Sequence, residues 1–324
     1  MPDRLFTDMA DSKHLALRFA AARAPEPPTR PRLKPKMATV EAFAAVAAAC
    51  LEQIAFHAPR VHRDGGIEDV HRMRVAVRRL RAALSVFRRA MDGRRLEFED
   101  DLRWLQDKLG AVRDWDVFRA GAVQPIEGEH NDVALVDEAG GMARDYAHLE
   151  LRIALESARS AALWKAMRRW LRGLARGREQ GGRLDRPIAK YARRELRRRD
   201  RKLRRRGRRI AALNEEELHA LRIGAKKLRY AAEFFFDLYP RKKLKRVLAR
   251  IKGLQALLGD LNDARTARTL LDRLEPRRGV GQPAIAFAHG DGLIEGAVLM
   301  RAKAERARVE REWERYEKAA KPWQ

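Results

Sequence analysis

The apolar positions of this chain follow a helical period from Met37 onward. Ala, Leu, Arg and Glu dominate, and runs of β-branched residues, which favour strands, are scarce. Stretches with Gly, Pro or other turn residues leave segments of roughly 12 to 35 residues, an ordinary range for packed helices. The pattern therefore predicts an all-α protein. The main interruptions are 63–66, 91–93, 124–128, 177–182, 239–240, 275–283 and 289–292.

An internal duplication is the most informative feature. The segment 70–87, VHRMRVAVRRLRAALSVF, matches 218–235, LHALRIGAKKLRYAAEFF, at an offset of 148 positions. A second pair of blocks, 105–114 and 254–263, follows at an offset of 149. Two matching pairs at nearly one offset indicate that the chain is a tandem repeat.

The duplication also predicts the domain organisation. One repeat would span about 37–180 and the other about 183–320, each with about four helices, and both would belong to one domain, 37–324. Residues 1–36 end in the basic, Pro-rich sequence ARAPEPPTRPRLKPK and are interpreted as an N-terminal extension or linker.

Each duplicated segment has one apolar face. At about 100° per residue, one side of each predicted helix gathers the apolar positions that would face the core. The helix starts are also encoded: Glu68 and Asp69 precede the first motif, and Asn214 with Glu217 resembles a capping box before the second. The predicted core positions are Met73, Val77, Leu80, Leu84 and Phe87, repeated as Leu221, Ala225, Leu228, Ala232 and Phe235.

The other side of each segment carries a basic stripe. A solvated charged face is the simpler interpretation, but the stripe contains almost no acids and recurs in both repeats with its spacing intact. Arginine suits a partly buried anion site because its planar group stays charged and gives two donors to one phosphate. We therefore predict an anion-binding surface at His71, Arg74, Arg78 and Arg81 and at His219, Arg222, Lys226 and Arg229.

The composition supports a polyanionic partner. There are 71 Lys and Arg residues against 45 Asp and Glu residues, a net charge of +26. Such an excess fits a nucleic acid, an anionic membrane surface or a phosphate polymer. The single cysteine, Cys50, lies in an apolar run and is expected to be a small core residue. No apolar run long enough for a membrane span and no secretory signal are recognised, so we expect a soluble cytoplasmic protein.

The most basic stretch is 192–210, ARRELRRRDRKLRRRGRRI, which has a narrow apolar seam every seven residues. As a free helix it would suit a nucleic acid or a membrane surface. We prefer the interpretation that it walls a groove together with the His219 helix. Its secondary basic wall would consist of Arg193, Arg197, Arg201 and Arg204.

The remaining polar residues leave alternatives open. His71 and His219 could donate to phosphate or orient neighbours, and metal binding, a phosphohistidine or a general acid are the rarer roles. Gly110 and Gly259 are expected to end helices, with Asp114 and Asp263 either as N-caps of the next helix or as partners of groove arginines. No motif of a nucleophile with its base, a phosphate-binding loop or a two-metal site is recognised. We therefore predict no catalytic residue, no metal site and no cofactor.

These blocks resemble the CHAD family, the conserved histidine α-helical domain. The resemblance rests on EDVHRMRVAVRRLRAALSVFRRAM (68–91), LQDKLGAVRDWDVF (105–118), LHALRIGAKKLRYAAEFFFDLYP (218–240), LQALLGDLNDA (254–264) and WERYEKAAKPW (313–323). It implies two tandem, pseudo-symmetric four-helix bundles with a basic groove between them, and inorganic polyphosphate as ligand. It also implies His71 and His219 as the family histidines and polyphosphate contacts from Arg74, Arg78, Arg79, Arg81, Arg222, Lys226, Lys227 and Arg229.

The chain departs from the family in two places. CHAD domains are often fused to a triphosphate-tunnel barrel of the CYTH family, and residues 12–37 look like the end of such a fusion without the barrel. The Gly- and Pro-rich stretch 275–292 matches nothing recognised and is expected to be a loop that caps the groove or moves. The missing barrel argues against triphosphate hydrolysis.

We therefore expect a protein that binds inorganic polyphosphate without catalysis, in the cytoplasm at polyphosphate granules and near granule proteins. The first alternative is a general nucleic-acid-binding protein that acts through 192–210, although few aromatic residues lie among its cations for base stacking. The second alternative is an enzyme that acts on phosphoanhydrides through His71 or His219.

Overall fold

The computed structural model describes residues 30–63, 65–128, 130–176, 184–274 and 282–324. Within these ranges the secondary structure is helical, with one isolated bridge between Ala38 and Pro187 and no β-strand. The prediction of an all-α protein is confirmed. The helices are α2 (Thr39–Arg63), α3 (Ile67–Phe87), α4 (Glu99–Phe118), α5 (Gln124–Glu127), α6 (Asn131–Glu156), α7 (Ala158–Ala175), α8 (Ile188–Gly207), α9 (Glu215–Phe234), α10 (Arg241–Leu274) and α11 (Gln282–Lys318), with the short η2 (Arg119–Val123), η3 (Ile210–Ala212) and η4 (Phe236–Leu238).

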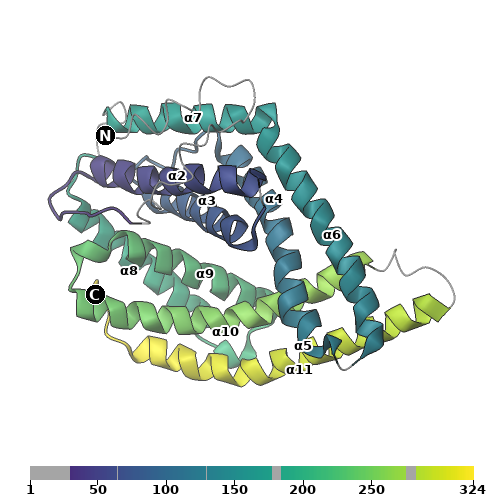
Figure 1. Ribbon diagram of the computed structural model, residues 1–324. Coiled ribbons are helices and arrows are strands. Elements are labelled where there is room, and N and C mark those ends of the chain that lie inside the picture. Colours follow the sequence, from purple (N-terminus) through teal and green to yellow (C-terminus); the bar gives the residue numbers. More distant parts are fainter. Residues whose placement is uncertain (1–29, 64, 129, 177–183, 275–281) are drawn as a thin grey trace.

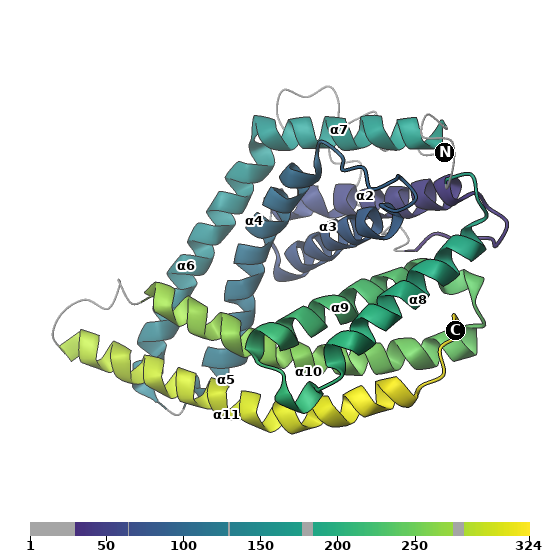
Figure 2. The ribbon, with the colours of Figure 1, turned by 180° about the vertical axis from the view of Figure 1, so that it is seen from behind.

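Within each half, helices that follow one another in sequence also pack together. In the first half α2 lies against α3, α3 against α4 and α4 against α6, with α7 across α2 (Figure 1). In the second half α8 lies against α9, α9 against α10 and α10 against α11 (Figure 2). The first half therefore has one more long helix than the expected four, because α7 follows α6 before the second half begins.

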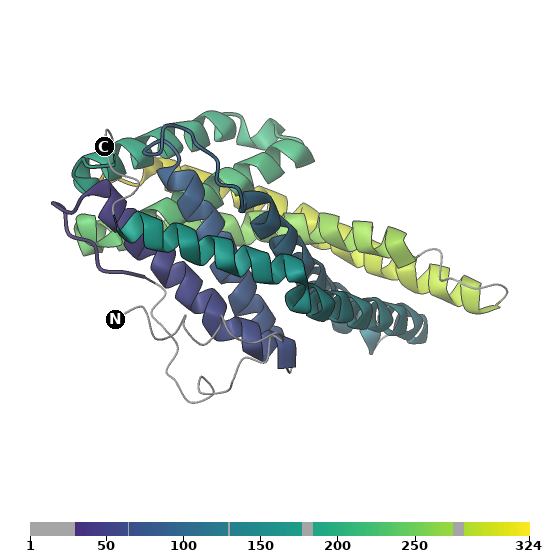
Figure 3. The ribbon, with the colours of Figure 1, turned by 90° about the horizontal axis from the view of Figure 1, so that it is seen from above.

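The contacts between the halves join helices at equivalent places in the repeat. The helix α3 packs on α9, α4 on α10 and α6 on α11. Figure 3 shows α11 and the end of α10 extending together to one side of the molecule, and Figure 1 shows α6 crossing α11 there. Contacts between equivalent helices are what a duplicated chain forms when its halves are related by an approximate two-fold axis.

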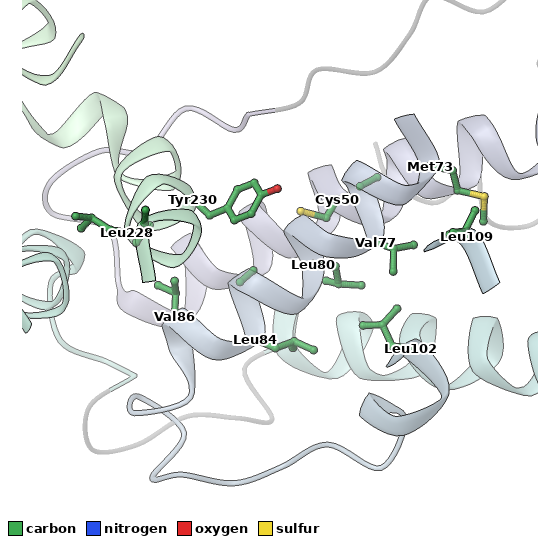
Figure 4. Packing of buried hydrophobic residues seen from close by; sticks show 14 of the residues in the cluster. Cys50, Met73, Val77, Leu80, Leu84, Val86, Leu102, Leu109, Leu228 and Tyr230 are labelled. Carbon is green, nitrogen blue, oxygen red and sulfur yellow. The ribbon is translucent and has the colours of Figure 1, made fainter. Parts of the chain in front are cut away.

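The apolar faces of the duplicated helices form the core. Met73, Leu80 and Phe87 of α3 are fully buried, as are Leu221 and Leu228 of α9. Figure 4 shows Cys50 among these side chains, and it is 3% exposed, which confirms its place in the core. Burial raises the pKa of the Cys50 thiol to about 11, so this sulfur stays protonated.

The predicted capping box is present at the start of α9. The Asn214 side chain accepts from the Glu217 backbone N–H, and the Glu217 carboxylate accepts from the Asn214 N–H. These contacts satisfy two of the free amide groups at the helix start. The start of α9 is thus fixed by local sequence alone.

Three predicted helix breaks are wrong. Gly110 lies inside α4 and Gly259 inside α10, so both helices continue through them, and Asp114 and Asp263 cannot be N-caps. The stretch 289–292 likewise lies inside α11. A Cβ on Gly290 would come within 2.4 Å of the Asp132 carbonyl oxygen on α6, so the glycine allows close helix packing and does not mark a turn. Residues 275–281 of the predicted loop lie outside the described residues.

The described end of the predicted linker is docked on the domain. Leu33 is buried in the core, and the Arg30 guanidinium lies 4.1 Å from the centre of the Phe236 ring. Residues 1–29 lie outside the described part of the chain. Of the described helices, only α2 has a stretch apolar and long enough to cross a membrane, and 61% of that stretch is buried inside the protein. A buried core helix has the same length and composition.

Candidate functional site

A cavity of about 780 Å³ lies between the two halves, and we call it the central cavity. Its walls come from α3 and α4 of the first half and from α9, α10 and α11 of the second, with η2 at one side. Six side chains of the predicted basic stripes line it in equivalent pairs: His71 with His219, Arg74 with Arg222, and Arg78 with Lys226. Equivalent residues of the two repeats therefore line one cavity.

The cavity has a surplus of positive charge. Seven Arg and Lys side chains line it against four carboxylates. The predicted members of the cationic set are Arg74, Arg78, Arg222 and Lys226, and the structure adds Arg113, Arg265 and Arg301. The carboxylates are Asp114, Asp260, Asp263 and Glu305. Such a set can neutralise several negative charges of one ligand.

Partial burial makes this charge costly to maintain without a ligand. Burial, reinforced by Arg78, Arg222 and Arg74, lowers the pKa of Lys226 to about 7. Burial also lowers the pKa of Arg74 and Arg222, and in both cases a neighbouring arginine lowers it further. Removal from water disfavours the charged form of each group, and nearby like charge adds to the effect. An anion in the cavity would relieve both penalties.

Two aspartates orient the paired arginines. Asp114 Oδ1 lies 3.8 Å from Arg74 Nη2, and Asp263 Oδ1 lies 3.9 Å from Arg222 Nη2. Because both aspartates face the cavity from the middle of a helix, the structure favours the alternative in which they are partners of groove arginines. Each contact is longer than a good hydrogen bond, so the guanidinium groups keep donors for a ligand.

The two histidines lie at equivalent places but have different partners. His219 Nδ1 is 2.8 Å from Asn262 Oδ1 and 2.9 Å from Arg265 Nη2. His71 Nδ1 is buried without a hydrogen-bond partner among the described residues. Burial lowers the pKa of both rings, and the charge of Arg113 lowers that of His71 further. Both rings are therefore neutral near pH 7 and suited to donate one hydrogen bond.

The remaining residues of the two stripes lie outside the central cavity. Arg79 Nη1 donates to Glu233 Oε2 at 2.8 Å, and Arg229 Nη1 donates to Glu233 Oε1 at 3.0 Å. Glu233 thus neutralises two predicted ligand cations and joins the halves, since Arg79 is on α3 and Glu233 on α9. These two arginines have a structural role in this arrangement.

Arg81 and Lys227 also lie away from the cavity. Arg81 is seven residues beyond Arg74, about 10 Å farther along the helix, where the cavity has ended. Burial and Arg103 lower the pKa of Arg81, and burial and Arg199 lower that of Lys227. The basic stripe predicted as one surface is therefore divided between a cavity and the contacts around it.

The predicted secondary wall on α8 lies outside the central cavity. Arg193, Arg197 and Arg201 line a separate hollow of about 660 Å³ with Lys190 and Arg194. Arg197 Nε donates to the Trp323 carbonyl at 2.6 Å, and Arg204 Nη2 to the Glu317 carbonyl at 3.3 Å. The expected groove with the His219 helix is not formed by these residues, because α8 turns its arginines toward the end of the chain.

Several cavity residues were missed by sequence reasoning. Arg113 and Asn262 occupy equivalent places in the second duplicated block, directly before Asp114 and Asp263, so the repeat already contained a signal for them. Tyr230 accepts a 2.7 Å hydrogen bond from Arg78 Nε, across the two halves. Arg265 and Arg301 lie outside the duplicated blocks, and no sequence pattern identified them.

Among the described residues, no group of three or more His, Cys, Asp and Glu side chains is placed to hold a metal ion. The arrangement of the cavity is suited to charge neutralisation. Its arginines can bind oxyanions from two sides, and its neutral histidines can add a donor at one end of each stripe.

The chain is similar to known proteins over most of its length. The profile of the CHAD domain matches residues 45–272. The crystal structure of the CHAD domain from the plant Ricinus communis aligns with a TM-score of 0.78 at 28% identity, covering 91% of this chain and 98% of that one. PptA from Streptomyces chartreusis aligns with a TM-score of 0.63 at 18% identity, covering 86% of this chain and 100% of that one, which is a likeness of fold. A comparison with curated protein sequences gave no match. Because the profile matches more than half of the chain and the duplicated His and Arg motifs line one cavity, the chain belongs to the CHAD domain family.

Proposed function

We propose that this protein binds inorganic polyphosphate in the central cavity. The observation that carries the proposal is the convergence of equivalent cations from both repeats, above all Arg74 with Arg222 and Arg78 with Lys226, on one partly buried cavity. The ligand must be rich in charge, because seven cations face the space. It must also be slender enough to lie between packed helices, which a chain of phosphates without bases or sugars satisfies.

The lining favours phosphate over nucleic acid. Its one aromatic residue is Phe118, which is 2% exposed, so the cavity offers no platform for stacked bases. Arginine forks bind phosphate oxygens in pairs, and the flanking histidines add single donors. The lining therefore fits a phosphate backbone, and among its described residues it has no exposed Phe, Tyr or Trp ring on which a base could stack.

We propose that binding is not accompanied by catalysis. The two histidines of the cavity have lowered pKa values and are poor general acids near pH 7. The aspartates at its wall lie beside arginines, which suits a role in orientation. In a cell that stores polyphosphate, such a protein would be found in the cytoplasm at the granules, where it could hold other granule proteins to the polymer.

Competition binding tests the proposal. Fluorescent long-chain polyphosphate is titrated with the protein at about 0.15 M salt and then competed with short polyphosphate, ATP, single-stranded RNA and duplex DNA at matched charge. We expect polyphosphate to compete far better than the other anions. We also expect the ligand to raise the melting temperature, because it binds the folded state and relieves repulsion in the cavity.

A matched pair of variants locates the site. Replacing Arg74, Arg78, Arg222 and Lys226 with alanine should abolish binding and leave the helical circular dichroism unchanged. The control removes the same number of charges from exposed positions of α10, by replacing Lys242, Lys243, Lys245 and Arg246 with alanine. Equal retention of polyphosphate by both variants would contradict the proposal. Phosphate release that disappears with His71→Ala or His219→Ala would indicate an enzyme instead.

The exposed hollow on α8 is the place where a nucleic acid would bind. Its five cations are exposed. The carboxylate that lines it, Asp200, is buried and accepts a hydrogen bond from Tyr316. The triple variant Lys190→Glu, Arg194→Glu and Arg201→Glu should therefore lower RNA and DNA binding. The matched control is Lys165→Glu, Arg169→Glu and Arg172→Glu on the exposed face of α7. The nucleic-acid function takes first place if RNA competes as well as polyphosphate and if the α8 variant, but not the α7 variant, loses RNA binding.

A further inference from the structure

The outer face of α6 carries a stripe of apolar side chains, each more than half exposed in the described protein. Met142 is 54% exposed, Tyr146 61%, Leu149 51% and Ile153 59%, and Leu135 extends the stripe toward the helix start. Isolated apolar residues are common on protein surfaces, but four large ones within twelve residues of one helix are not isolated. We call Met142, Tyr146, Leu149 and Ile153 the α6 seam.

The spacing of the α6 seam is that of a helix pair. The four residues follow one another at intervals of four, three and four, which keeps them on one line when two helices cross at a small angle. The opposite face of α6 is already covered, because it packs on α4 and α11. Figure 1 shows α6 along one edge of the molecule, crossing α11 only near one end.

The charge of α6 differs from that of the protein as a whole. The helix contains six carboxylates and two arginines, in a protein with a net charge of +26. Two copies of such a protein repel one another strongly over most of their surface. Because Asp137 and Glu150 are paired with Arg119 and Lys108, α6 carries neither the positive surplus of the protein nor a large free negative charge, and repulsion between two copies is lowest where α6 faces α6.

We propose that the α6 seam is a self-association surface, in which α6 of one copy packs antiparallel on α6 of a second copy. In this register Met142 faces Ile153 of the partner subunit, and Tyr146 faces Leu149 of the partner subunit. The same register places Asp145 beside Arg152 of the partner subunit, and the reciprocal pair forms on the other side of the axis. Asp145 is 78% exposed and Arg152 is exposed, and Asp145 contacts the neighbouring Arg144 through Oδ1 at 3.4 Å, which leaves its second carboxylate oxygen for Arg152 of the partner subunit.

The size of the surface sets the strength of the contact. A stable dimer typically buries about 800 Å² on each partner, and a single helix face covers less. We therefore expect a dissociation constant of about 10 to 100 μM. Because screening weakens the long-range repulsion between the two basic molecules more than it weakens apolar contact, association should strengthen as salt rises from about 0.15 M to about 0.5 M.

Sedimentation equilibrium of the full chain, up to about 200 μM and without ligand, tests the proposal. We expect Tyr146→Glu with Ile153→Glu to weaken association more than tenfold. The control places glutamate at two exposed apolar positions elsewhere, Ile67 on α3 and Met300 on α11, and should leave association unchanged. A monomer at every concentration and both salt levels would overturn the proposal, as would equal weakening by the control.

Charge exchange tests the register. Asp145→Arg alone places two arginines together on each side of the axis and should weaken the dimer. Adding Arg152→Asp restores an opposite-charge pair and should recover most of the loss. A dimer that Asp145→Arg weakens and Arg152→Asp does not rescue would overturn the antiparallel register. None of these measurements involves polyphosphate, so their outcome is independent of the proposed function.

Discussion

The two copies of the duplicated motif have kept their cations and diverged in what surrounds them. Arg74 and Arg222 face the central cavity with an aspartate at 3.8 and 3.9 Å, so this pair is nearly symmetric. The two histidines are not in symmetric surroundings. His219 is hydrogen-bonded to Asn262, whereas the position equivalent to Asn262 beside His71 is Arg113. The two sets of ligand groups are alike in charge, although Lys226 stands where the first copy has Arg78, and their neighbours differ more.

The divergence is larger where the halves meet. Tyr230 and Glu233 of the second copy receive hydrogen bonds from Arg78 and Arg79 of the first. The equivalent positions in the first copy are Ala82 and Ser85, which offer neither a phenol nor a carboxylate. These two hydrogen bonds have no equivalent in the opposite direction, and Arg78 is held in place by a partner that Lys226 lacks.

The largest expected effect tests the symmetric part of the comparison. Arg74→Ala and Arg222→Ala should each weaken polyphosphate binding by about tenfold to a hundredfold, because each removes a charged donor worth about 1.5–3 kcal/mol. The two losses should agree within about threefold, because a long ligand that spans both copies meets both arginines alike. Titration of fluorescent polyphosphate with each variant measures this. A loss confined to one variant would show that the ligand uses only one copy.

An intermediate effect separates Lys226 from its counterpart Arg78. The pKa of Lys226 is about 7 in the free protein, and a bound polyanion must raise it, so binding above pH 7 requires proton uptake. Affinity should therefore fall about tenfold between pH 7 and pH 9, and Lys226→Arg should remove most of this dependence because arginine stays charged. Titrations across this range check it, with Lys243→Arg on the exposed part of α10 as the control. An equal pH dependence in Lys226→Arg would contradict the assignment.

Lys226 also makes the free energy of unfolding depend on pH. Between pH 7 and its ordinary pKa of 10.5, Lys226 is protonated in the unfolded chain and largely neutral in the folded protein. The unfolded state then binds more protons, so the contribution of Lys226 to the free energy of unfolding increases as pH rises through this window.

The smallest expected effect concerns the histidines. Arg113→Asn should give His71 the amide partner that His219 already has and remove a nearby positive charge, so the pKa of His71 should rise toward its ordinary value. Histidine resonances followed by NMR during a pH titration measure this shift. Arg103→Asn, on the exposed face of α4, is the control. A His71 pKa that does not move would show that burial alone sets it.

The sequence predicted the fold class and the location of the site because both follow from local periodicity. The spacing of Met73, Leu80 and Phe87 already identified the buried face of α3, and the repeat identified α9 as its equivalent. The predicted breaks at Gly110 and Gly259 were wrong because a glycine weakens a helix by only about 1 kcal/mol. Packing against neighbouring helices outweighs that cost.

What the sequence by itself determined is the set of helices, their duplicated order, their apolar faces and the stripes on which the cations lie. Only the tertiary structure decided that Arg74 and Lys226 face a shared cavity while Arg79 and Arg229 are neutralised by Glu233. It also placed Arg197 of α8 against the end of the chain. The physical reason is that helix periodicity is encoded within a few neighbouring residues, whereas burial, charge partners and pKa depend on side chains brought together from more than a hundred positions away.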